Sequence, residues 1–152
     1  RHLLAPDAAH LLGLETEEDA DADLINTLLS RMETLRADFT NTFRALGTPA
    51  ARDEFLDPAG YDAWEQDWRT RLAREGATPE DRLPALRRAN PAVIPRTHRI
   101  EDAIAAGVAG DFAPFRRLGL ALARPFDDTP GVEDLRRPPA EDEVVSQTFC
   151  GT

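Results

Sequence analysis

The clearest pattern in this chain is a run of large apolar residues at helical spacing in its first third. They recur at steps of three or four residues, the repeat of one face of an α-helix. These residues are Leu24, Leu28, Met32, Leu35, Phe39, Phe43 and Leu46. Gly47 and Pro49 end the predicted helix. A coiled coil would show the same spacing, but phenylalanine at two seam positions is bulky for a dimer, which favours a core-facing helix of a bundle.

A second helix is predicted to begin at Asp57-Pro58, a capping residue followed by a first-turn proline, and to end at Gly76. One face of it carries mostly aromatic residues, which we interpret as core rather than as a platform for a ligand. They are Tyr61, Trp64, Trp68 and Leu72.

A third helix is predicted after Thr78-Pro79, which repeats the same opening. It runs to Asn90-Pro91, because the residue before a proline disfavours helical geometry. Pro84 lies inside this segment and is expected to kink or shorten the helix.

The second half of the chain predicts two more helices. One is capped by Thr97 and places Ile100, Ile104 and Val108 on one face. The other follows Gly110-Asp111 and has an apolar face of Phe112, Phe115, Leu118 and Leu122. Pro114 falls in its first turn, where the missing N–H does little harm because it would have no partner within the helix. Only residues 143–148 alternate enough to suggest a strand.

The predicted fold class is therefore all-α, an irregular bundle of about five or six helices over residues 1–135. Proline and acidic residues become dense from Pro125 onward. We expect residues 136–152 to form a tail that runs extended over a surface.

The charge of the chain limits its partners. Its 152 residues carry a net charge of -10, with an estimated pI of 4.7, so its field repels phosphate backbones and anionic lipids. No run approaches the length of a membrane span, and the segment from Arg1 to Leu14 lacks the apolar core of a signal peptide. We expect a soluble, cytoplasmic protein with no nucleic-acid or membrane partner, cut from a longer chain because it begins with Arg1 rather than Met.

All 18 basic residues are arginines, so neither a Walker A lysine nor the lysine of a kinase-like nucleotide site is present. Positive charge concentrates in the middle of the chain, at Arg82, Arg87, Arg88, Arg96 and Arg99. These guanidinium groups suit nucleotide phosphates or an acidic neighbouring domain. Internal pairing with the acid-rich start of the first helix is the interpretation that we favour.

The acidic run before the first helix imitates the opening of a calcium loop at Asp19, Asp21 and Asp23. Such a loop needs glycine at its sixth position and glutamate at its twelfth, which here are Leu24 and Ser30. The sequence predicts instead that Asp21 or Asp23 caps the first helix.

A nucleophilic triad is not supported, because Cys150 lies in the terminal tail whereas His98 lies near a helix start. The single cysteine cannot form an internal disulfide or a thiolate zinc site, which fits a reducing compartment.

Several segments occur together in the order and spacing of one known family. They are Asp38-Phe39-Thr40-Asn41-Thr42-Phe43-Arg44, Trp64 with Trp68-Arg69-Thr70-Arg71-Leu72, Asn90-Pro91 through Glu101, Gly110-Asp111, Arg124-Pro125-Phe126-Asp127, and the terminal Phe149-Cys150-Gly151-Thr152. Together they resemble the C-terminal region of the selenoprotein O family.

Members of that family are pseudokinase-fold enzymes that transfer AMP from ATP to Ser, Thr or Tyr of client proteins. The resemblance implies that this chain is a helical C-terminal domain of a bacterial-type parent, with no catalytic, cofactor-binding or metal-binding residue of its own. ATP and Mg or Mn would bind to the parent's upstream kinase-like domain, which is the implied partner of this chain together with the client proteins.

By the same resemblance, four positions are candidates for contact with the upstream domain, and His98 is as compatible with a buried structural role as with proton transfer. They are Asn90, Arg96, His98 and Glu101. Thr97 stands where the family usually has Asn, and Phe126 replaces a Tyr, so the hydrogen bonds of that amide and phenol are in question here.

Cys150 occupies the position at which selenium-containing members carry selenocysteine, so the resemblance suggests a redox role. A passive thiol remains equally open, because no cationic neighbour in the tail would activate it. The alternative to an enzyme domain is a stand-alone helical interaction module without catalysis, which would use the apolar face of residues 24–46 to bind its partner.

Overall fold

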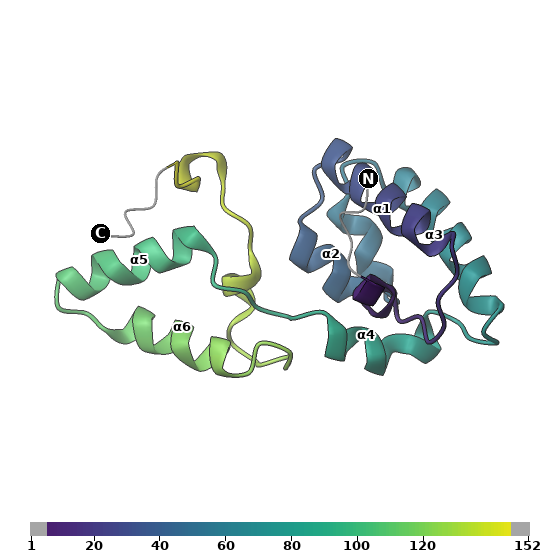
Figure 1. The fold of residues 1–152 in the computed structure, drawn as a ribbon. Coiled ribbons are helices and arrows are strands. Elements are labelled where there is room, and N and C mark those ends of the chain that lie inside the picture. The colour runs from purple at the N-terminus through teal and green to yellow at the C-terminus, as the bar shows by residue number, and fades with distance from the viewer. Residues whose placement is uncertain (1–5, 147–152) are drawn as a thin grey trace. The chain divides into compact units, whose positions relative to one another are not determined.

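The computed structural model describes residues 6–146 and divides the chain into two compact units, unit 1 (Arg1–Pro91) and unit 2 (Ala92–Thr152). Figure 1 shows the order of the helices. The described residues form six α-helices and five short 3-10 helices and no strand, which confirms the all-α prediction. Within residues 136–146 the predicted tail contains one 3-10 turn, Glu141–Glu143.

Unit 1 packs its helices around two tryptophans. Its elements are η1 (Pro6–Leu12), α1 (Asp21–Thr34), α2 (Phe39–Ala45), η2 (Pro49–Glu54), α3 (Pro58–Ala73), η3 (Glu80–Arg82) and α4 (Leu83–Ala89). Trp64 and Trp68 lie fully buried and stacked on α3, with ring centroids 5.4 Å apart. Their indole N–H groups donate to the carbonyls of Leu24, at 2.9 Å, and Leu12, at 3.0 Å. The prediction that these side chains belong to the core is confirmed.

The prediction of a single helix over residues 24–46 is wrong. The segment forms two helices instead, because the chain is not helical between Thr34 and Phe39. Arg36 adopts the left-handed conformation, with φ of 54°, and the Ala37 amide donates to the Met32 carbonyl at 2.9 Å, which closes a Schellman turn. The Asp38 carboxylate then accepts from the Asn41 amide at 2.9 Å and starts α2.

The apolar repeat nevertheless points mainly into the core. Leu28, Met32, Phe43 and Leu46 are buried, whereas Phe39 is 56 % exposed. This face is therefore not available as the partner surface of a stand-alone module.

The boundaries of α3 follow the predicted local motifs. The Asp57 carboxylate accepts from the Ala59 amide at 3.1 Å, and Pro58 opens the helix. After the helix, Gly76 has φ of +70° and the Ala77 amide reaches back to the Leu72 carbonyl at 3.1 Å. Pro84 shortens the next helix as expected, since it falls in the first turn of α4.

Unit 2 is built on two helices that lie side by side, α5 (Thr97–Val108) and α6 (Ala113–Ala123), followed by η4 (Glu133–Arg136) and η5 (Glu141–Glu143) (Figure 1). The Asp111 carboxylate accepts from the Ala113 amide at 2.9 Å, so α6 begins where predicted. Thr97 does not cap α5, because the capping position is Arg96, without a side-chain capping bond, and Thr97 is already helical.

The core of unit 2 contains only small and medium-sized side chains. Its buried members are Ala92, Val93, Leu118, Ala121, Val132 and Leu135. The amide groups of Ala92 and Val93 both donate to the carbonyl of Pro125, at 2.7 and 3.2 Å, which joins the start of the unit to the end of α6.

The left-handed residues provide a test of these turns. We expect Arg36→Gly to raise the free energy of unfolding by about 0.5 to 1 kcal/mol, because glycine removes the steric cost of a positive φ at this exposed position. Gly76→Ala should lower it by about 1 kcal/mol, since an added Cβ meets open space and only the backbone is strained. Urea denaturation measures both, and equal effects of the two changes would contradict this account of the turns.

Candidate functional site

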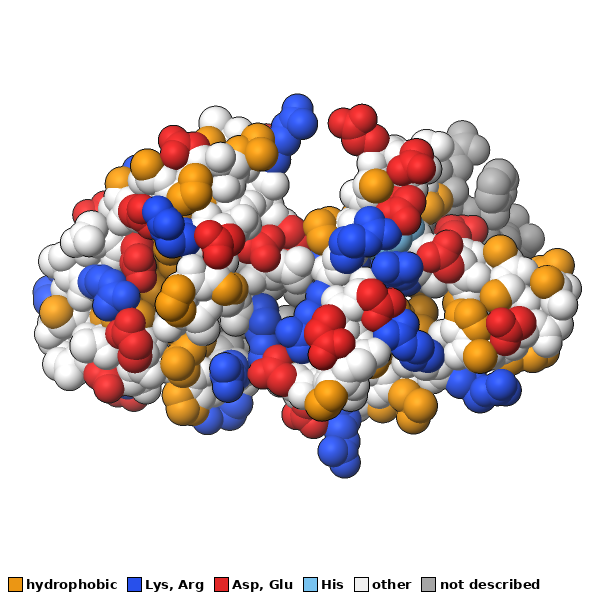
Figure 2. All heavy atoms as spheres, turned by 180° about the vertical axis from the view of Figure 1, so that it is seen from behind, with side chains coloured by type: hydrophobic (Ala, Val, Ile, Leu, Met, Phe, Trp, Pro, Cys, Tyr) orange, Lys and Arg blue, Asp and Glu red, His pale blue; other side chains and the backbone are white. Residues whose placement is uncertain are grey.

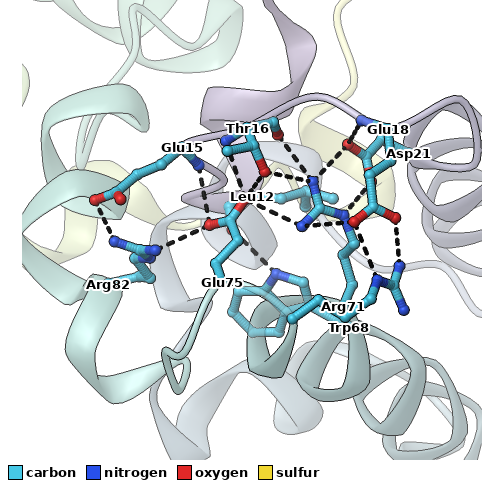
Figure 3. A network of polar contacts seen from close by, with 10 residues as sticks. Leu12, Glu15, Thr16, Glu18, Asp21, Trp68, Arg71, Glu75 and Arg82 are labelled. Carbon is cyan, nitrogen blue, oxygen red and sulfur yellow. Dashed lines mark hydrogen bonds and ion pairs between the residues drawn. The ribbon is translucent and has the colours of Figure 1, made fainter.

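The most extensive polar cluster of the described residues surrounds Arg71 of α3 in unit 1. Its guanidinium binds both carboxylate oxygens of Asp21, at 2.7 and 3.0 Å, and donates to the Thr16 carbonyl at 2.8 Å. It also donates to Glu75 at 3.0 Å, and Figure 3 shows its side chain pointing into this group of acceptors. Arg71 is only 2 % exposed and Asp21 6 %, so this is a buried ion pair whose charge is compensated in several directions.

Glu75 connects this cluster to the segment that precedes α1. Its carboxylate accepts from the amides of Glu15 and Thr16, at 3.1 and 3.0 Å, and from the Thr16 hydroxyl at 2.6 Å. It also pairs with Arg82 at 2.9 Å, and Arg82 in turn pairs with Glu15. Burial by itself raises the pKa of Glu75, but these hydrogen bonds and Arg71 together lower it to about 2.

The cluster corrects the interpretation of the acidic run. The capping position of α1 is Ala20, with no side-chain capping bond, so neither Asp21 nor Asp23 caps the helix. Asp21 instead holds Arg71 and accepts from the Glu18 amide at 2.8 Å. Among the residues that the structure describes, no group of three carboxylate, histidine or cysteine side chains is placed to hold a metal ion.

The arginines of the middle of the chain have different surroundings. Arg82 pairs with the acidic segment before α1, as predicted, through Glu15. Arg99 pairs instead with Asp102 at 3.4 Å and donates to the Asp134 carbonyl at 2.9 Å. Arg87 and Arg88 are exposed, and within residues 6–146 no ion pair involves them. Figure 2 shows arginine and acidic side chains interspersed over the visible face, without a patch of one sign.

The four candidates for contact with an upstream domain fall in both units. In unit 1, Asn90 is 2 % exposed and its side-chain amide donates to the Leu11 carbonyl at 3.0 Å, which ties the end of α4 to η1. In unit 2, Arg96 and His98 are buried at the start of α5, whereas Glu101 is exposed one turn later. Contact with an upstream domain remains a prediction for all four.

His98 borders a small cavity of about 350 Å³ that is also lined by Arg96, Pro139 and Glu143. Burial and the charge of Arg99 hold the pKa of His98 below its ordinary value, although Glu143 opposes this. Its Nε2 has no hydrogen-bond partner among the described residues. The lowered pKa favours a neutral imidazole, and both the structural role and the proton-transfer role of His98 stay predictions. Cys150 lies outside the described residues.

Unit 2 exposes large apolar side chains on α5, α6 and the turn between them, where Figure 2 shows hydrophobic side chains at the surface. Their exposed fractions include 54 % for Ile104, 86 % for Val108 and 65 % for Phe115. None of the described helices is long and apolar enough to cross a lipid bilayer. Because these large apolar side chains are exposed together, the surface of unit 2 resembles a docking site for another part of a protein more than any other feature of the described residues does.

Comparison with known proteins identifies the relatives of this chain, although no family model matches it. The chain is 54 % identical over 141 residues to a protein of Ruegeria pomeroyi. It is 52 % identical over 141 residues to a protein of a second Ruegeria strain, TM1040. It is 49 % identical over 144 residues to a protein of Jannaschia strain CCS1. Each of these relatives is named protein nucleotidyltransferase YdiU, and each match covers 93 % of this chain. The chain belongs to the YdiU family, which is the selenoprotein O family.

The chain spans only about 30 % of the length of these YdiU relatives. The similarity runs through both units, since 93 % of the chain is matched. The Arg71 cluster and the apolar surface of unit 2 therefore belong to one part of a larger family architecture.

Sequence reasoning missed the cluster, although all its members are visible in the sequence. Arg71 follows Trp68 by three residues and so lies on the buried face of α3. An arginine on the apolar face of a helix requires buried acceptors, and this was the available indication of the Asp21 pair.

Loss of Arg71 should be the most destabilising change in the cluster. We expect Arg71→Met to lower the free energy of unfolding by about 3 kcal/mol or more, because it leaves the Asp21 carboxylate buried without its cation. Arg74→Met is the matched control, since its pair with Glu18 is about half exposed, and its loss of stability should be much smaller. Urea denaturation of both variants tests this, and similar losses would show that burial of the pair is unimportant.

The stability of the chain should fall in acid because of Glu75. Its pKa in the folded chain, about 2, lies below the ordinary value of 4.5, so its contribution is complete above pH 4.5 and is lost as the pH falls toward 2. We expect a loss on the order of 2 kcal/mol over this interval. Glu75→Gln should reduce this pH dependence, whereas Glu17→Gln, at an exposed position, should retain it. Chemical denaturation across pH 2 to 6 measures the difference.

Proposed function

We propose that this chain is the C-terminal helical domain of a protein adenylyltransferase, an enzyme that moves AMP from ATP to Ser, Thr or Tyr hydroxyls of client proteins. The observation that carries the proposal is the 54 % identity to a protein named a nucleotidyltransferase over 93 % of this chain. The domain would support a kinase-like core in the rest of the protein.

The nucleotide and the metal of such a reaction are proposed to bind outside this chain. The sequence has no lysine to pair with phosphates, and within residues 6–146 no three ligands converge on one point. ATP and Mg or Mn would bind to the remaining part of the enzyme, so no chemical step is assigned to this chain. Its contribution would be to stabilise that part and to position the C-terminal segment.

Cys150 is proposed as a redox-sensitive element of the same enzyme. Cys150 stands at the position where the selenium-containing members that this chain resembles carry selenocysteine, and in a longer protein it could pair with a second cysteine. Oxidation would then join the two sulfurs as their S–H bonds break, and a cellular oxidant such as a disulfide would take up the two electrons and two protons and become two thiols.

Transfer of labelled AMP from ATP, with Mg or Mn, to a general protein substrate tests the proposal. We expect no transfer by this chain alone and clear transfer by the longer protein that contains it. The longer protein should respond to oxidising conditions, and Cys150→Ser should abolish that response while leaving the activity under reducing conditions unchanged. A longer protein that transfers no AMP would overturn the proposed activity, and an unchanged response in the serine variant would overturn the role of Cys150.

A further inference from the structure

The apolar surface of unit 2 forms a defined groove between α5 and α6. We call it the α5–α6 groove; it has a volume of about 600 Å³ and is lined only by apolar side chains and Gly107. Ile104 and Val108 line it from α5, Phe112 from the turn and Phe115 from α6. Each of these four side chains is more than half exposed. No side chain that lines the groove can form a hydrogen bond or carry a charge, so the groove selects an apolar occupant.

The groove is an incomplete core rather than a surface with a few scattered apolar residues. An amphipathic helix normally packs its apolar stripe against a core. In α5 the buried residues are His98 and Ala103, neither of which is one of the large apolar residues of that stripe. Ile104 and Val108, which carry that stripe, are 54 % and 86 % exposed. Unit 2 is also small, and its buried core has no side chain larger than leucine. A unit of this size gains little stability from its own core, so covering the groove would contribute substantially.

The length of the relatives indicates what covers the groove. About 70 % of each YdiU relative lies outside the region that matches this chain, so in the family this groove accompanies a much larger chain. A covalently attached segment is present at an effective concentration in the millimolar range, which an unlinked partner does not reach. A second copy is a poorer fit, because a two-fold symmetric contact would oppose two concave surfaces of the same kind.

We propose that the α5–α6 groove binds an amphipathic helix from the part of the parent protein that this chain does not include. Apolar side chains of that helix, spaced at i, i+3, i+4 and i+7, fill the groove between Ile104, Val108 and Phe115. The proposal rests on the proposed function only in assuming a longer YdiU parent. It identifies the surface through which this domain would support the rest of that protein.

Two single substitutions in the longer protein test the proposal. Val108→Gln places a polar group in the groove, whereas Leu120→Gln is the matched control, because Leu120 is 76 % exposed on α6 but does not line the groove. Glutamine retains good helix propensity, so neither change should disturb the helices themselves. Hydrogen exchange of the α5 and α6 amides is measured in the longer protein and in both variants. We expect Val108→Gln to speed this exchange about tenfold and Leu120→Gln to leave it within twofold.

Equal exchange in the two variants would overturn the proposal. The oligomeric state of this chain alone provides a second test, and we expect a monomer with either glutamine. A dimer that Val108→Gln abolishes and Leu120→Gln preserves would assign the groove to a second copy and would also overturn the proposal. Exchange rates do not depend on catalysis. Failure of the proposed adenylyltransferase function would therefore show only in the AMP-transfer assay. Failure of the groove proposal would show only in the exchange data.

Discussion

The guanidinium of Arg71 joins three segments of unit 1 that are far apart in the sequence. It lies on α3, binds the carboxylate at the start of α1, and donates to the carbonyl of Thr16 in the preceding segment. A buried cation without acceptors would cost more than the fold could supply, so the path of residues 15–21 around Arg71 is a requirement of the fold. The two indole N–H groups of α3 add to this constraint, since each donates to a backbone carbonyl of the same N-terminal region.

Unit 2 is stabilised in a different way. Several of its ion pairs lie at the surface, such as that of Arg117, which donates to Asp134 at 2.8 Å while both side chains remain about half exposed. Such pairs add little stability, and the unit's core lacks aromatic side chains. The apolar side chains that could enlarge that core line the α5–α6 groove instead. The two units therefore differ in how they are stabilised, because unit 1 has a large aromatic core and a buried ion pair, whereas unit 2 leaves its apolar groove exposed.

This difference fits a chain that makes up about 30 % of its YdiU relatives. Unit 1 has the larger core of the two, and the open apolar groove of unit 2 is the surface that we propose attaches the chain to a larger protein.

The sequence by itself determined the features that depend on neighbouring residues. The ends of α3 follow from Asp57-Pro58 and Gly76, and the start of α6 follows from Asp111 and Pro114, because caps and positive-φ turns act over one helical turn. The break after α1 escaped this reasoning, since Arg36 is not a glycine and the apolar repeat continues across the gap. Only the tertiary structure decided that Asp21 pairs with Arg71, 50 residues away, and that the stripe of α1 is buried while that of α5 remains open. Periodicity shows which residues share a face of a helix, but burial depends on what packs against that face, and this is a property of distant parts of the chain.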